Sequence, residues 1–299
     1  MAVVNPFLRP GAWYNGALHV HTTRSDGRLT PEESMEFHRS NGYHFLAITD
    51  HDVITDIAHL STPDFLNIPG VEVSYGHNPA GQSYHIVLVG ISRLSRPPIG
   101  QPIQTVIDQW ASAAQLAFLA HPYWSGTTLL EMLPLERLAG MEIFNTSAQT
   151  DLGKGLATVH WDDLLLRDKR WLGFAVDDTH GINDDAAGGW VVVKSETLTR
   201  AAILAALNQG AFYASSGPEI FDFRVEDGVV SVRCSEVVAI NFLGHTQWGF
   251  QRRAGPGKTI TSAEWPVAPR ACYVRAECID ARGHAAWTNQ WLLSDTRNG

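Results

Sequence analysis

Gly-Ala-Leu-His-Val-His-Thr-Thr-Arg-Ser-Asp-Gly, residues 16–27, is the stretch on which the interpretation of the fold depends. Its apolar beginning predicts a strand. Because side chains i and i+2 of a strand share a face, His19 and His21 point the same way and together suit one metal ion. Asp26 follows in a Ser-Asp-Gly turn just past the predicted strand end.

A second apolar run ends in the same manner. Residues 45–49 read Phe-Leu-Ala-Ile-Thr, and Asp-His-Asp follows, which places His51 at the end of a strand. A helix is predicted between the two runs, since Thr30 suits its N-cap and Glu33 completes a capping box. Barrel enzymes build their active sites at the C-terminal ends of strands. A lone His-x-His is common by chance, but the two signals together favour a functional site.

Composition indicates a globular protein. The chain has 299 residues, is 44% hydrophobic and carries a net charge of −9, with no clustered basic footprint for nucleic acid. No apolar stretch reaches membrane-spanning length, and the N-terminus lacks the pattern of a signal peptide. The three cysteines, Cys234, Cys272 and Cys278, lie far from the histidine motifs and are expected to be reduced thiols. We therefore expect a cytoplasmic location.

Strands alternate with helices as far as residue 217, which predicts a parallel α/β core. Strands are expected at 45–49, 68–74, 84–91, 116–120, 141–144, 172–176 and 190–193, and helices at 31–41, 103–114, 155–168 and from the Thr199 cap to Gly210. Beyond residue 217 the helix signals vanish and apolar residues alternate with period two. We therefore predict a barrel domain at 1–217 and a small, β-sandwich-like antiparallel domain at 218–299.

Further candidate ligands stand within or beside the predicted strands. Glu72 lies inside the apolar run Pro-Gly-Val-Glu-Val, where a buried carboxylate needs a partner, either a salt bridge or a metal ion. His85 heads one strand and is either a ligand or a hydrogen-bonded core histidine, and His121 ends another. Asp178 and His180 share a face of an Asp-x-His motif.

These motifs, in this order over residues 19–180, resemble those of the PHP family (polymerase and histidinol phosphatase domain). The resemblance implies an α/β fold, a distorted (β/α)7 TIM-like barrel. It also implies three metal positions: the first held by His19, His21, Glu72 and Asp178, the second by Glu72, His85 and His121, and the third by Asp26, His51 and His180. Looser similarities point to stand-alone hydrolases of the CehA/McbA group. They are Ile143-Phe144-Asn145 after Glu142, residues 211–218, and Ala286-Trp287-Thr288-Asn289.

The resemblance implies two to three divalent transition-metal ions, for which the donor types suit Zn, Mn or Fe. The implied activity is metal-dependent hydrolysis of a small phosphorylated metabolite or nucleotide by a hydroxide that bridges two ions sharing Glu72. One alternative is hydrolysis of a carbamate or carboxyl ester at the same site. Another is a metal-binding domain without catalytic activity.

The roles of the other polar residues are less closely constrained. Asp52 is expected either to orient His51 or to protonate the leaving group. Arg24, between His21 and Asp26, is placed to bind a substrate anion or else is a solvated loop charge. Asp50, which also flanks His51, is expected to orient that histidine. Other residues near strand ends are assigned to the pocket or its surroundings: Tyr123, Trp124 and Asn145 as lining residues, Asp177 as a candidate for supporting the ligands, and Glu142 with its role open.

Overall fold

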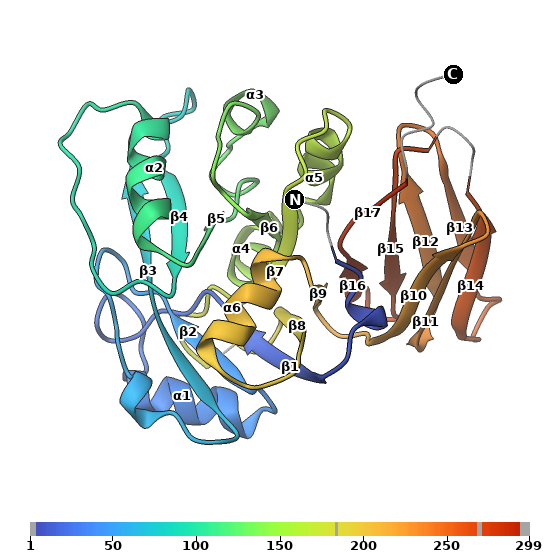
Figure 1. Cartoon of the computed structure of the whole chain (residues 1–299), viewed down its shortest axis with the longest axis horizontal. Coiled ribbons are helices and arrows are strands. Elements are labelled where there is room, and N and C mark those ends of the chain that lie inside the picture. Colours follow the sequence, from blue (N-terminus) through green and yellow to red (C-terminus); the bar gives the residue numbers. More distant parts are fainter. Residues whose placement is uncertain (1–3, 183–184, 268–270, 294–299) are drawn as a thin grey trace.

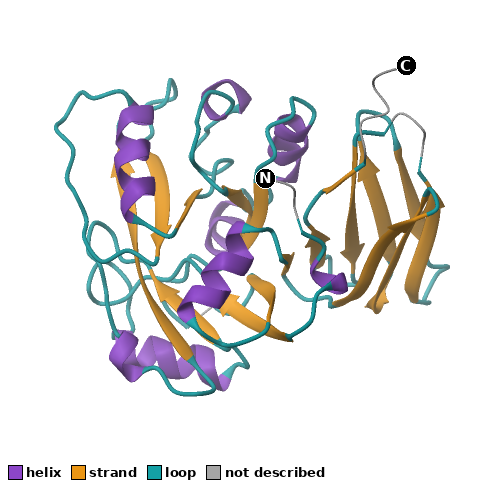
Figure 2. Cartoon of the chain, viewed as in Figure 1, coloured by secondary structure: helices purple, strands orange, loops and turns teal. Residues whose placement is uncertain are grey.

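The computed structural model describes residues 4–182, 185–267 and 271–293. Helices surround the strands of the barrel part, whereas the C-terminal part is built from strands and loops (Figure 2). Seven strands follow one another around the barrel part in chain order: β1 (Ala12–Ala17), β2 (Phe45–Ile48), β3 (Leu66–Tyr75), β4 (Tyr84–Val89), β5 (Leu116–Leu119), β6 (Gly140–Asn145) and β7 (Leu172–Val176).

The helices of the barrel part lie on the outside of these strands (Figure 1). They are α1 (Pro31–Ser40), α2 (Ile103–Ala113), α3 (Leu129–Met132), α4 (Thr146–Leu152), α5 (Thr158–Leu165) and α6 (Arg200–Asn208), with the short 3-10 turns η1 (Pro6–Leu8) and η2 (Ala58–Leu60). The predicted capping box of α1 is present, because the Thr30 hydroxyl accepts the Glu33 N–H and the Glu33 carboxylate accepts the Thr30 N–H.

The barrel closes just beyond the ends of β1 and β7. Val20 bridges Thr179 in parallel, and the His21 N–H donates to the Thr179 carbonyl at 2.9 Å. The Asp178 N–H in turn donates to the His19 carbonyl at 3.0 Å. β1 itself ends at Ala17, earlier than the sequence suggests, so the first two histidines belong to this closing segment.

The sheet is mixed, and the expectation of a wholly parallel core is wrong in two places. β4 runs antiparallel to both β3 and β5, because residues 76–83 form too short a connection for the crossover that parallel strands need. β8 (Trp190–Ser195) runs antiparallel to β1 and extends the sheet outside the barrel. The expected α/β barrel is confirmed in this distorted form.

The strands after α6 form two sheets. The main sheet continues from β8 through β9 (Phe212–Ser215), β16 (Ala285–Thr288), β15 (Tyr273–Ile279) and β12 (Ala239–Gly244) to β13 (Gly249–Arg253), with β17 (Trp291–Leu292) beside β15. A second, antiparallel sheet contains β10 (Ile220–Glu226), β11 (Val229–Val237) and β14 (Ile260–Pro266).

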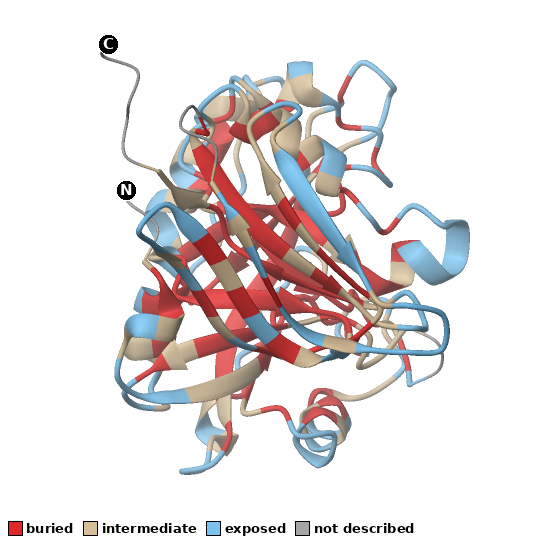
Figure 3. Cartoon of the chain, turned by 90° about the vertical axis from the view of Figure 1, so that its right-hand side faces the viewer, coloured by how far each residue is buried: buried red, intermediate tan, exposed pale blue. Residues whose placement is uncertain are grey.

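Apolar side chains fill the space between these two sheets. Val230 and Val232 of β11 are buried with Phe242 of β12 and Val274 of β15, and exposed residues alternate with buried ones along β11 (Figure 3). This is the packing of a sandwich with one face of each strand inward. Hydrogen bonding between β9 and β16 crosses the predicted boundary at 217/218, and the division into two domains stays a prediction.

Within the described residues, none of the helices combines the length and hydrophobicity needed to span a bilayer.

A buried histidine lies beneath the barrel wall. The side chain of His38, on α1, is fully buried. His38 Nδ1 donates to the Ser34 carbonyl at 2.8 Å, and burial lowers the pKa of His38 to about 4. His38 is therefore neutral in the folded protein near neutral pH.

We predict that His38 makes the apoprotein less stable as the pH falls. An unfolded histidine binds its proton near pH 6.5, whereas folded His38 resists protonation until about pH 4, so stability is lost as the pH falls through that window. At pH 5 the loss should reach about 2 kcal/mol. Urea unfolding of wild type and His38→Gln at pH 7, 6 and 5 measures it. The variant should show the flatter profile, and parallel profiles would contradict the assignment.

Candidate metal centre

The side chains predicted as ligands gather at one end of the barrel. The predicted ligands that lie at or just beyond the ends of parallel strands meet at this end of the barrel, because the carboxyl ends of parallel strands lie along one edge of the sheet. His85 reaches the same edge from the beginning of β4, since β4 runs in the opposite direction. The structure thus brings together all nine predicted residues, namely His19, His21, Asp26, His51, Glu72, His85, His121, Asp178 and His180.

The Glu72 carboxylate is the centre of this cluster. Glu72 lies in β3 and is only 1% exposed. Imidazole nitrogens lie 2.7–3.2 Å from its two oxygens: His19, His21 and His51 at Oε2, and His85 and His121 at Oε1. The carboxylate therefore faces two groups of donors at once, one at each oxygen.

Three donor groups can be distinguished within the described residues. The first is His19, His21, Glu72 and Asp178; the second is Glu72, His85 and His121; the third is His21, Asp26, His51 and His180. In each group the donor atoms lie within 4.8 Å of one another. Imidazole and carboxylate donors at such spacing suit divalent transition metals. The groups coincide with the three sets that the resemblance implies, except that His21 also enters the third.

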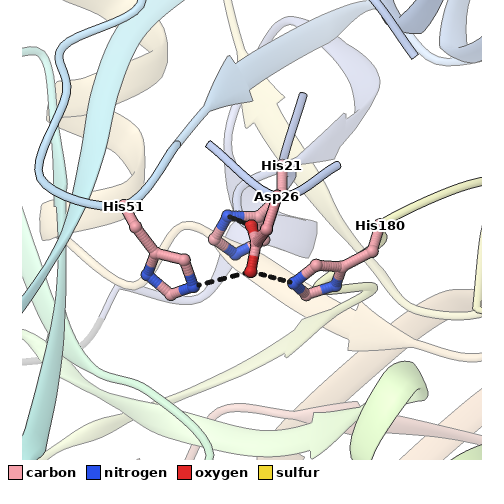
Figure 4. A group of neighbouring side chains, drawn as sticks. All are labelled: His21, Asp26, His51 and His180. Carbon is pink, nitrogen blue, oxygen red and sulfur yellow. Dashed lines mark ion pairs between the residues drawn. The ribbon is translucent and has the colours of Figure 1, made fainter. Parts of the chain in front are cut away.

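The third group is the most open of the three. Figure 4 shows the Asp26 carboxylate between the rings of His51 and His180, with His21 behind it. Asp26 Oδ2 lies 3.5 Å from Nε2 of both His51 and His180, and Asp26 Oδ1 lies 3.6 Å from His21 Nδ1. Because His21 Nε2 lies 3.0 Å from Asp178 Oδ1, one imidazole contacts two donor groups through its two nitrogens.

Charge is strongly coupled across the cluster. Burial lowers the pKa of His21, but hydrogen bonds to Asp178 and Glu72 outweigh burial and raise it to about 9. Burial likewise opposes the charge on Glu72, yet the surrounding histidines hold the pKa of that carboxyl well below its usual range. The carboxylates are thus kept ionised, and a cation that enters competes with protons for the imidazoles.

The turn that carries Asp26 is fastened by Asp50. Asp50 accepts hydrogen bonds from the Thr22 N–H and hydroxyl at 2.6 and 2.7 Å and from the Ser25 and Thr55 hydroxyls at 2.8 and 2.6 Å. Asp50 therefore orders this loop, whereas the sequence suggested that it orients His51. Gly27 allows the turn to close, because a Cβ there would lie 2.4 Å from the backbone of His21.

Non-glycine residues with left-handed backbone follow three of the strands. They are Asp52 after β2, His121 after β5 and Asp178 after β7, with φ values of 55°, 25° and 55°. Such conformations are strained and cluster at functional sites, where the surrounding structure holds them. Here they turn the chain sharply where each strand reaches the cluster.

A cavity of about 420 Å³ opens over the donor groups. Besides ligand candidates it is lined by Arg28, Trp124, Ser147, Ala148, Asp151 and Asp185. Trp124 was expected here, and its ring centroid lies 5.0 Å from that of His121. Tyr123 instead packs on His160, with ring centroids 5.7 Å apart.

Two of the predicted catalytic residues do not line this cavity. Asp52 is exposed, and its backbone N–H donates to the Glu72 carbonyl at 2.9 Å. Arg24 is also exposed, and its backbone N–H donates to the Thr22 hydroxyl at 3.3 Å. Their catalytic roles stay predictions. Sequence reasoning overlooked Arg28, although it stands only two residues after Asp26.

Two further buried carboxylates act next to the ligand candidates. Glu142 Oε1 lies 2.6 Å from His19 Nδ1. Asp177 instead accepts hydrogen bonds from the backbone N–H groups of Ala187, Gly188 and Gly189 at 2.7–3.0 Å. Burial raises the pKa of Asp177 to about 7, against the effect of these donors. Asp177 thus fastens the segment that follows β7.

The fold resembles those of solved structures. The chain aligns over 94% of its length with 94% of a two-domain protein from Bacteroides vulgatus that contains a predicted PHP-like metal-dependent phosphoesterase, at a TM-score of 0.55 and 14% identity. An amidohydrolase from Chromobacterium violaceum, solved with sulfate and without metal, aligns with 57% of this chain over 89% of its own, at a TM-score of 0.46 and 18% identity.

No family model and no curated protein matches the sequence. The likeness to the Bacteroides protein establishes a PHP-like α/β fold over nearly the whole chain, and so the resemblance seen in the motifs extends to the fold.

We predict that the purified protein binds more than one divalent ion per chain, because three donor groups lie side by side. The measurement is elemental analysis after loading with Mn²⁺ or Zn²⁺ and removal of free metal. A single ion, or none, would show that the clustered histidines serve salt bridges to Glu72 and Asp178 rather than a multinuclear centre.

Proposed function

We propose that this chain is a metal-dependent hydrolase that cleaves the phosphoester bond of a small phosphorylated metabolite or nucleotide. The observation that carries the proposal is the juxtaposition of three donor groups around Glu72 at the floor of a single cavity. Multinuclear sites of this kind suit in-line displacement at phosphorus, because neighbouring ions stabilise both the attacking and the leaving oxygen.

The residues fit two to three divalent ions, with Zn, Mn or Fe as candidates. Glu72 would hold ions of the first and second groups through its two oxygens, and Asp26, His51 and His180 would hold a third. Three such ions would bring six positive charges against the three carboxylates Asp26, Glu72 and Asp178. The surplus of positive charge suits an anionic substrate.

Divalent ions bound there would supply Lewis acidity and lower the pKa of water, so that hydroxide is available near neutral pH. The chain's own residues provide position. Glu72 aligns the first two donor groups, since it touches histidines of both. Arg28, at the wall of the cavity, is placed to hold a phosphate oxygen by a charge-assisted hydrogen bond. Trp124 covers the side of His85 and His121.

Two other functions would use the same residues. The first rival is hydrolysis of a carbamate or carboxyl ester, and the second is metal binding without catalysis. The expected surplus of positive charge favours phosphate over a neutral carbamate. Assays with p-nitrophenyl phosphate, bis-p-nitrophenyl phosphate and 1-naphthyl N-methylcarbamate separate the three. Turnover of the carbamate alone would favour the first rival, and inertness of the loaded protein toward all three would favour the second. A cytoplasmic location remains part of the proposal.

We predict that Glu72→Gln affects the site more than His180→Asn does. Gln preserves the volume of Glu72 but removes the charge between two ions, so their repulsion is less compensated. Glu72→Gln should lose metal from two positions and nearly all turnover, whereas His180→Asn should empty one position and keep some turnover. Metal content and kcat are compared, with circular dichroism as the folding control. Full metal content and near-native turnover in Glu72→Gln would make Glu72 a structural salt-bridge partner.

Arg28 and Arg24 form a matched pair in one loop. We predict that Arg28→Ala raises KM for a phosphoester about tenfold, the effect of losing one charge-assisted hydrogen bond. Arg24→Ala should change KM little, because Arg24 does not line the cavity. Steady-state kinetics of both variants provide the measurement. The reverse order of effects would restore Arg24 as the residue that binds the anion.

A further inference from the structure

Glu142 and Asn145 of β6 form a buried link between three ligand candidates. Glu142 is 1% exposed, and its Oε1 lies 2.6 Å from His19 Nδ1. Glu142 Oε2 accepts the backbone N–H of His121 at 2.8 Å and the side-chain amide of Asn145 at 2.9 Å. The same amide donates to Asp178 Oδ2 at 3.1 Å.

We propose that Glu142 and Asn145 are positioning residues that hold His19, His121 and Asp178 in their metal-binding geometry. Neither residue lines the cavity, and neither belongs to the donor groups of the described part of the chain. They therefore act through other side chains rather than on a substrate. This inference rests on the metal-binding part of the proposed function and does not require that the bound metals catalyse anything.

Glu142 selects one tautomer of His19. The carboxylate only accepts hydrogen bonds, and it already accepts two at Oε2, so the proton of neutral His19 belongs on Nδ1. The lone pair is then left on Nε2, which lies 3.1 Å from Glu72 Oε2 and 3.2 Å from Asp178 Oδ1. A carboxylate behind a ligating histidine fixes the ring and makes it a stronger donor.

Asn145 has a fixed orientation as well. Its side-chain oxygen caps α4 by accepting the Ala148 N–H at 2.8 Å, and therefore its NH₂ group must face the carboxylates. One amide thus donates to Glu142 and Asp178 together. A neutral group thus bridges two neighbouring carboxylates by hydrogen bonds and fixes their relative position.

A β-bulge brings the two residues together. Residues three apart in a regular strand point to opposite faces. The pairing of β6 with β7 shifts register between Glu142 and Phe144, so the bulge turns Asn145 to the same side as Glu142. Bulges that re-aim a side chain are common beside active sites, which agrees with a positioning role.

Glu142→Gln tests the link because either orientation of the new amide breaks it. With its oxygen toward His19, the amide NH₂ meets the His121 N–H and the Asn145 NH₂, which are donors. With its NH₂ toward His19, the ring is driven to carry its proton on Nε2, where a metal must bind. In both cases the volume of the side chain is preserved and the geometry of the ligands is not.

The measurement is a Co²⁺ titration of the metal-free full chain followed by visible absorption. Glu142→Gln should weaken one binding step about 10- to 100-fold, the usual effect of losing such an outer partner. Glu136→Gln is the control, because Glu136 is an exposed carboxylate paired with Lys169, and it should bind Co²⁺ like wild type. His19→Gln should weaken the same step, and the loss in the double variant should be smaller than the sum of the two single losses, since part of the effect of Glu142 runs through His19.

Wild-type affinity for every Co²⁺ ion in folded Glu142→Gln would overturn the proposal, as would fully additive losses in the double variant. If Glu142→Gln does not fold, ¹H–¹⁵N spectra of the Zn²⁺-loaded wild type test the proposal instead. A His19 ring protonated at Nδ1 and metal-bound at Nε2 supports the proposal, and the reverse overturns it. If His19 binds metal through Nε2 and the loaded protein hydrolyses no ester, the proposed function is wrong, whereas the positioning role of Glu142 and Asn145 is supported.

Discussion

The buried carboxylate of Glu72 is the interaction on which the site depends. A carboxylate that is 1% exposed is very unfavourable unless its charge is compensated. Here five imidazoles compensate it, and they come from the ends of β1, β2 and β5 and from the beginning of β4. The barrel must therefore bring these strand ends to one point. The reversal of β4 serves this need, because it delivers His85 to the same edge as Glu72.

Three other acidic residues support the ligand candidates from outside the donor groups. Asp50 precedes His51 and fastens the loop that carries Asp26, while Asp177 precedes Asp178 and fastens the segment after β7. Glu142 contacts His19 itself. Each of these carboxylates is held by several donors, which are backbone N–H groups, hydroxyls, the Asn145 amide or the His19 imidazole, so the ligand candidates are supported by a preorganised frame. Sites need such support, because loosely held ligands bind metals and substrates poorly.

Much of this arrangement could be predicted from the sequence. Strand periodicity and polar strand ends indicated the α/β core and the candidate ligands, since these depend on local pattern. The barrel and the division of the ligands into three groups were implied by the resemblance of the motifs to the PHP family. Features set by tertiary contacts could not be predicted in this way. The approach of Glu142 to Asn145, for example, depends on a bulge in the pairing of β6 with β7. The antiparallel course of β4 is a different case, because it follows from the short connection at residues 76–83, which is visible in the sequence and which the prediction of a parallel core did not take into account. Nothing local distinguishes Arg28, which lines the cavity, from Arg24, which does not.

In the proposed metal centre, Glu72 joins two metal positions and a third lies at Asp26. Anomalous diffraction from crystals of the Mn²⁺- or Zn²⁺-loaded protein, collected on both sides of the absorption edge, tests it directly. We expect one peak among His19, His21, Glu72 and Asp178, a second among Glu72, His85 and His121, and a third among Asp26, His51 and His180. Peaks elsewhere, or a Glu72 carboxylate in contact with histidines and with no peak at either oxygen, would contradict it.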